Sequence, residues 1–71
     1  MNRSIQLLDV VALLRDRRDF ELIAGQVGTV VDVLASGVFE VEFSDDEGRT
    51  YAMVALNESE LIALHYNPVA A

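Results

Sequence analysis

Alternating apolar and polar residues mark the clearest strand of the chain, at residues 38–43. Every second residue is apolar, and Glu40 and Glu42 occupy the opposite face. The loop at residues 44–49 is acidic and contains a glycine that permits positive φ, and residues 50–56 return as a second strand. The pattern therefore predicts a β-hairpin with one apolar face.

Glycine spacing predicts another strand earlier in the chain. Gly25 marks a turn, and β-branched residues dominate the following run to Leu34, which is typical of a strand. Gly28 lies inside that run, where a missing side chain indicates a bulge or a close backbone approach. A phosphate-binding loop would need a helix directly after the glycines, and residues 29–31 do not favour one. Residues 35–37 form a hairpin turn to the next strand.

The two ends of the chain carry weaker patterns. Residues 5–14 form an apolar run, in which Val10 and Val11 favour a strand. The charge cluster at residues 15–19 follows as a solvated loop, with a contact surface as the alternative. Residues 57–60 have the spacing of a capping box, with room for one 3₁₀ turn before a last strand at residues 61–64.

Together these elements predict an all-β fold, a small five-stranded SH3-like barrel with one 3₁₀ turn before the last strand. The chain has 71 residues and no room for a second domain. We expect residues 1–66 to form the barrel and residues 67–71, which include Pro68, to form a flexible C-terminal tail.

Composition narrows the classes of function. The absence of cysteine excludes disulfides, thiolate metal sites and a cysteine nucleophile. No segment resembles a signal peptide or a membrane span, so we expect a cytoplasmic protein without a membrane partner. The net charge of −7 repels nucleic acid and anionic lipids and favours a basic protein partner.

Four short stretches carry a resemblance to a known family. They read L-L-D-V-V-A-L-L, G-Q-V-G-T-V-V, E-V-E-F and R-T-Y-A, at residues 7–14, 25–31, 40–43 and 49–52. In these the chain resembles a family of small bacterial proteins of unknown function, about 70 residues long. Residues 25–30 also resemble the turn of KOW domains. Residues 37–43 and 56–61 resemble the SH3-like subunit that helps dock ferredoxin on the photosynthetic NDH complex. All three resemblances imply an SH3-like barrel.

The residues give little support to catalysis. His65 is the only histidine, so a catalytic triad or a histidine metal site would rest on one residue near the C-terminus. Asp45, Asp46 and Glu47 lack the alternating ligand spacing of a calcium loop. We therefore expect no enzyme activity, no catalytic residues, no metal and no cofactor.

Residues 50–56 are apolar on both strand faces, which points to a binding surface. If Ala52, Val54 and Leu56 face the core, the intervening side chains form an apolar patch beside the acidic ones of the neighbouring strand. We expect the partner-binding residues to be Glu40, Glu42, Asp45, Asp46, Tyr51 and Met53. The second face could instead be covered by the loop through Phe20 and Leu22, or by a homodimer.

These observations predict a small acidic protein-interaction module that binds a basic partner and neutralises or regulates it. An antitoxin, an immunity protein or an accessory subunit would fit this description. The alternative is a KOW-like nucleic-acid-binding barrel, which would use the clustered cations Arg15, Arg17 and Arg18, with Arg3 as a further candidate.

Overall fold

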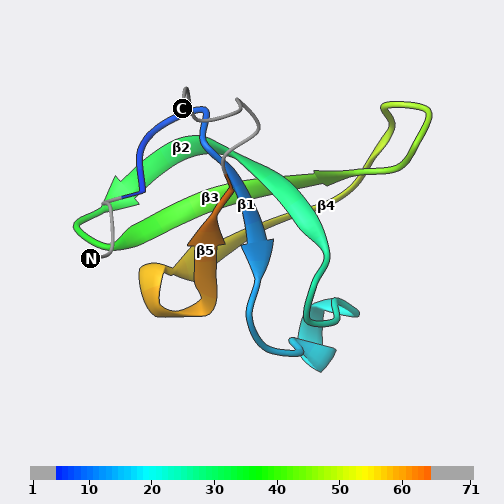
Figure 1. The fold of residues 1–71 in the computed structure, drawn as a ribbon, viewed down its shortest axis with the longest axis horizontal. Coiled ribbons are helices and arrows are strands. Elements are labelled where there is room, and N and C mark those ends of the chain that lie inside the picture. Colours follow the sequence, from blue (N-terminus) through cyan, green and yellow to red (C-terminus); the bar gives the residue numbers. More distant parts are fainter. Residues whose placement is uncertain (1–4, 65–71) are drawn as a thin grey trace, which may run out of the picture.

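The computed structural model describes residues 5–64, which form five antiparallel strands and two 3₁₀ turns but no α-helix (Figure 1). The expected all-β class and the 3₁₀ turn before the last strand are confirmed, and η1 is an addition that the sequence pattern did not predict. The sheet order is β4-β3-β2-β1-β5. In chain order the elements are β1 (Val10–Leu13), η1 (Arg18–Phe20), β2 (Val27–Ala35), β3 (Val38–Ser44), β4 (Thr50–Asn57), η2 (Glu58–Glu60) and β5 (Leu61–Ala63).

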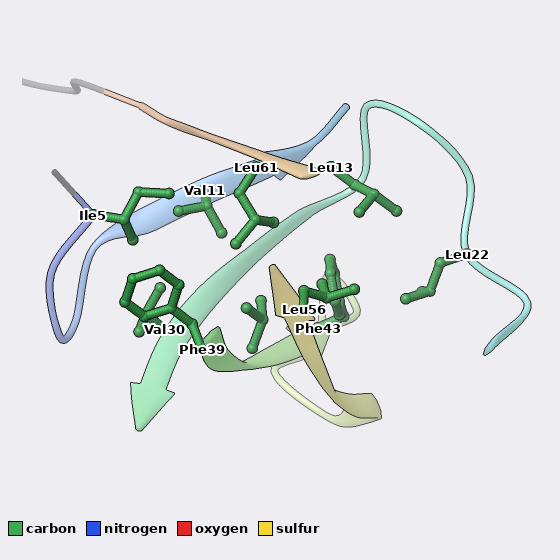
Figure 2. Close-up of a cluster of buried hydrophobic side chains, with 10 residues drawn as sticks. Ile5, Val11, Leu13, Leu22, Val30, Phe39, Phe43, Leu56 and Leu61 are labelled. Atoms are coloured by element: carbon green, nitrogen blue, oxygen red, sulfur yellow. The ribbon is translucent and has the colours of Figure 1, made fainter. Parts of the chain in front are cut away.

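The sheet twists strongly and encloses one apolar core on its inner face (Figures 1 and 2). Alternate residues of the strands supply most of the core, as a period of two requires. Leu22 joins them from the loop between β1 and β2 and points toward the strands (Figure 2). The buried hydrophobic residues are Ile5, Val11, Leu13, Leu22, Val30, Phe39, Val41, Phe43, Leu56 and Leu61.

Gly28 marks a close approach of β2 to β3, one of the two explanations that its position in the strand suggested. A Cβ atom built there would lie 2.7 Å from the Glu42 carbonyl oxygen and 2.8 Å from Val41 Cγ1. Gly28 pairs with Phe43, whose ring would be 3.0 Å from that same atom. A residue with a Cβ atom therefore does not fit at this position.

The first apolar run forms a shorter strand than its length suggests. Only Val10–Leu13 belongs to β1, and the residues before it make a turn in which the Asp9 carboxylate accepts the Gln6 backbone N–H at 2.9 Å. Leu8 has a φ of 71°, in the left-handed region, so the strand cannot extend through it. Ile5 nevertheless reaches the core.

Two expectations lie outside the described residues: the surroundings of His65 and the flexible tail at residues 67–71. Within residues 5–64, no helix is long and apolar enough to cross a membrane.

Candidate functional site

Three carboxylates lie together on the outer face of β2 and β3. Glu40 pairs with Asp32 of β2, and Glu42 is two residues further along β3. Paired residues of an antiparallel sheet point to the same side, so Asp32, Glu40 and Glu42 share one surface, which we call the acidic row. The ion pairs found within residues 5–64 involve Arg17 and Arg49, and none reaches the acidic row.

The acidic row borders β4, the edge strand of the sheet. Glu42 pairs with Met53, and Glu40 pairs with Ala55. Met53 is 50% exposed, whereas Ala52 and Val54 pack against the core and Leu56 is buried. The residues of β4 that face the core are therefore those expected at these positions. Met53 and Ala55 face outward and lie beside the carboxylates.

Tyr51 lies apart from this face because the register shifts between Phe43 and Ser44. Its ring is 6.3 Å from that of Phe43, a core residue, and its hydroxyl accepts a hydrogen bond from Gln26 Nε2 at 3.1 Å. Tyr51 is half exposed, but its contacts are with Phe43 and Gln26, and it is not grouped with Met53 as the strand alternation predicted.

Asp45 serves the hairpin between β3 and β4. Its Oδ1 atom accepts the backbone N–H groups of Glu47 and Arg49, both at 2.9 Å, and its Oδ2 atom lies 3.3 Å from Arg49 Nε. Arg49 also pairs with Glu47. Asp45 is therefore engaged within its own loop, and Asp46 is exposed at the next position of that loop.

The sequence pattern missed Asp32 as a member of the acidic row. Gly28 and Val30 face inward, and simple alternation would place Asp32 inward with them. The register shift between Val30 and Asp32 moves the carboxylate outward, opposite Glu40. A charged residue at an inward position of an apolar strand is the signal that could have predicted this bulge.

The loop between β1 and β2 does not extend over Met53. Leu22 is 1% exposed and belongs to the core, while the Phe20 ring lies 4.7 Å from the Arg17 guanidinium carbon. Arg17 also binds Glu60 of η2 at 2.8 Å and Asp19 at 2.9 Å. We call Arg17, Asp19, Phe20 and Glu60 the Arg17 cluster, which joins this loop to η2.

Charge pairing shifts three pKa values in the Arg17 cluster. The Asp19 and Glu60 carboxylates raise the pKa of Arg17, and Arg17 lowers the pKa of Asp19. Burial opposes ionisation of Glu60, but the Asn57 N–H and the Arg17 guanidinium outweigh burial and hold the pKa of Glu60 below its ordinary value of 4.5.

We expect Glu60→Gln to lower stability at pH 7 and to weaken its dependence on pH. Because the pKa of Glu60 is lower in the folded chain, its ionised form stabilises the fold above the ordinary value of 4.5, and this contribution is lost as the pH falls through the folded-state pKa. Urea unfolding from pH 7 to pH 3 measures the effect. Asp19→Asn, at an exposed carboxylate on the same guanidinium, serves as the control and is expected to have a smaller effect; equal effects would contradict the role of Glu60.

The outer face of β2 and β3 carries negative charge but no arrangement of metal ligands among the described residues. No group of three or more histidine, cysteine, aspartate or glutamate side chains within residues 5–64 could hold a metal ion. Thr50 donates its hydroxyl hydrogen bond to the Glu42 carboxylate, which links the acidic row to the start of β4. The face thus combines negative charge with one exposed thioether.

Comparisons with known proteins give one result. Neither the curated proteins nor the solved structures contain a match. A family model does match, over residues 7–63, and this range includes every strand and the whole acidic row. The chain therefore belongs to the family described as a domain of unknown function, DUF4926.

Proposed function

We propose that this protein is an acidic interaction module that binds a basic partner protein through the acidic row and the adjoining surface of β4. The observation that carries the proposal is the register that places Asp32, Glu40 and Glu42 on one face beside exposed Met53. Methionine is enriched at protein interfaces, and polar side chains form the rim around their apolar centre. The net charge of −7 would accelerate association with a cationic partner.

The pairing of two arginines within the chain favours a protein over a nucleic acid as the partner. Arg17 is the middle of the cluster that a KOW-like barrel would use, and it is held by two carboxylates of this chain. Arg49 is likewise paired with Asp45 and Glu47. Cations neutralised within the chain contribute little to phosphate binding, which depends on the release of counterions by free basic groups.

We further propose that this chain neutralises or regulates its basic partner in the cytoplasm. It would then act as an antitoxin, an immunity protein or an accessory subunit does. A small acidic sheet that covers the cationic site of a larger protein is sufficient for this role. We also propose that the fold is an SH3-like barrel. In the sheet order β4-β3-β2-β1-β5 the first and last strands are neighbours, as they are in such a barrel.

Co-expression with the products of neighbouring genes tests the proposal. The tagged chain is purified at increasing salt, and we expect a stoichiometric basic protein that elutes as the salt concentration rises. The double variant Glu40→Gln/Glu42→Gln should lose this protein at lower salt than the wild type. Glu21→Gln/Glu58→Gln removes the same charge at exposed positions outside the acidic row and is the matched control.

Equal losses in the two double variants would mean that net charge alone determines binding and would contradict the acidic row as the site. Recovery of the chain without any partner would contradict a tight complex. Retention of nucleic acid at low salt would favour the KOW-like alternative.

A further inference from the structure

In the part of the chain that the structure describes, no strand pairs with the outer edge of β4, which is eight residues long (Thr50–Asn57). β4 pairs with β3 on one side and stands last in the sheet order. The segment contains no charged residue and no proline. The opposite edge, β5, is only three residues long.

Such an edge is unusual for a protein that stays monomeric. Natural edge strands are kept short or carry charges, prolines or bulges, because unpaired N–H and C=O groups accept a further strand. In β4 the one such device is the register shift at its beginning, next to Ser44. The rest of the strand can accept another main chain.

The side chains next to this edge indicate which side chains an added strand would carry. Ala55 lies between the edge and Glu40, and Asp32 lies behind Glu40 in the same row. Neighbouring strands are about 4.8 Å apart, so a lysine or arginine opposite Ala55 could extend over its methyl group to the Glu40 carboxylate. In the next outward row, Met53 offers an apolar contact in front of Glu42.

We propose that an extended basic segment of the partner adds to the edge of β4 as a sixth strand, with a cationic side chain over Ala55 that pairs with Glu40. This inference rests on the proposed function and specifies how the partner binds. Main-chain hydrogen bonds would supply the affinity and the acidic row the preference for positive charge. A second copy fits less well, because it would bring a net charge of −7 toward a net charge of −7.

A synthetic peptide tests this mode of binding directly. The probe is an eight-residue fluorescent peptide of alternating lysine and valine, and its anisotropy is measured against the full chain. We expect binding that falls at least about tenfold, or about 1.4 kcal/mol, when the four central backbone nitrogens are methylated. N-methylation removes the donors of a strand but leaves the charges unchanged.

The protein variant that complements this peptide is Ala55→Phe, which blocks the path to Glu40 without changing charge. We expect at least about tenfold weaker peptide binding. Ala24→Phe makes the same change at an exposed alanine in the loop before β2 and should bind as the wild type does. Urea unfolding of both variants shows whether either one has lost its fold.

The outcomes separate the inference from the proposed function. If binding needs Glu40 and Glu42 but tolerates N-methylation and Ala55→Phe, the edge mode is wrong and the acidic interface stands. If neither peptide binds while the natural basic partner is still captured, the edge mode is again wrong. A stable dimer in light scattering that the peptide does not dissociate would assign the edge to a second copy and would overturn the inference.

Discussion

Gly28→Val is expected to unfold the protein. A Cβ atom at this position would lie within 3.0 Å of atoms of Val41, Glu42 and Phe43, one of them the Glu42 carbonyl oxygen in the backbone of the paired strand. Relief of that contact requires β2 and β3 to separate at the place where the core is completely buried. We expect a loss of more than about 4 kcal/mol in the free energy of unfolding, comparable to the total stability of a domain this small.

Urea unfolding followed by circular dichroism measures this loss. Gly48→Ala is the control, because Gly48 has a φ of +82° but no atom within 4 Å of its built Cβ. Only the conformational cost of the left-handed region applies there, about 1–2 kcal/mol. A Gly28→Val variant as stable as Gly48→Ala would show that β2 and β3 are not as close as the structure has them.

Leu22→Ala is expected to cost about 2–5 kcal/mol, although Leu22 lies in a loop. The side chain is 1% exposed and points from the loop toward the buried side chains of the strands (Figure 2). The bridge between Arg17 and Leu22, with N···O distances of 2.8 and 3.0 Å, fixes the loop backbone at this point. Truncation would leave a cavity that the surrounding strands cannot fill.

Ile23 provides a matched control for this prediction. It follows Leu22 directly but is 63% exposed, so Ile23→Ala should change stability by no more than about 0.5 kcal/mol. Thermal or urea unfolding of the two variants gives the comparison. A similar small effect at both positions would mean that the loop does not contribute to the core.

Hydrophobic periodicity predicted the strands that carry their own alternation. Polar and apolar residues alternate strictly in the β3 segment, and its inner and outer faces are those that the pattern indicates. The β4 segment is apolar on both faces, so its pattern does not determine which set faces inward, and one set could only be assumed. The burial of Leu56 agrees with that assumption. Glycine and capping signals located the turns for similar local reasons.

Features that depend on bulges and loop packing could not be predicted in the same way. A register shift placed Asp32 in the acidic row, and another moved Tyr51 toward Phe43. The Arg17 cluster joins residues 43 positions apart, a pairing that local spacing does not reveal. The charged loop was expected to be solvated, yet Arg17 within it is held by Glu60.

We expect the outer face of β3 and β4 to be the binding surface. Titration of a ¹⁵N-labelled sample with the alternating lysine and valine peptide identifies that surface through the residues whose amide signals shift. We predict shifts concentrated at Glu40, Glu42, Met53 and Ala55, with little change in the loop that contains Arg17. Shifts centred on that loop, or spread evenly over the acidic residues, would show that the peptide does not bind this face.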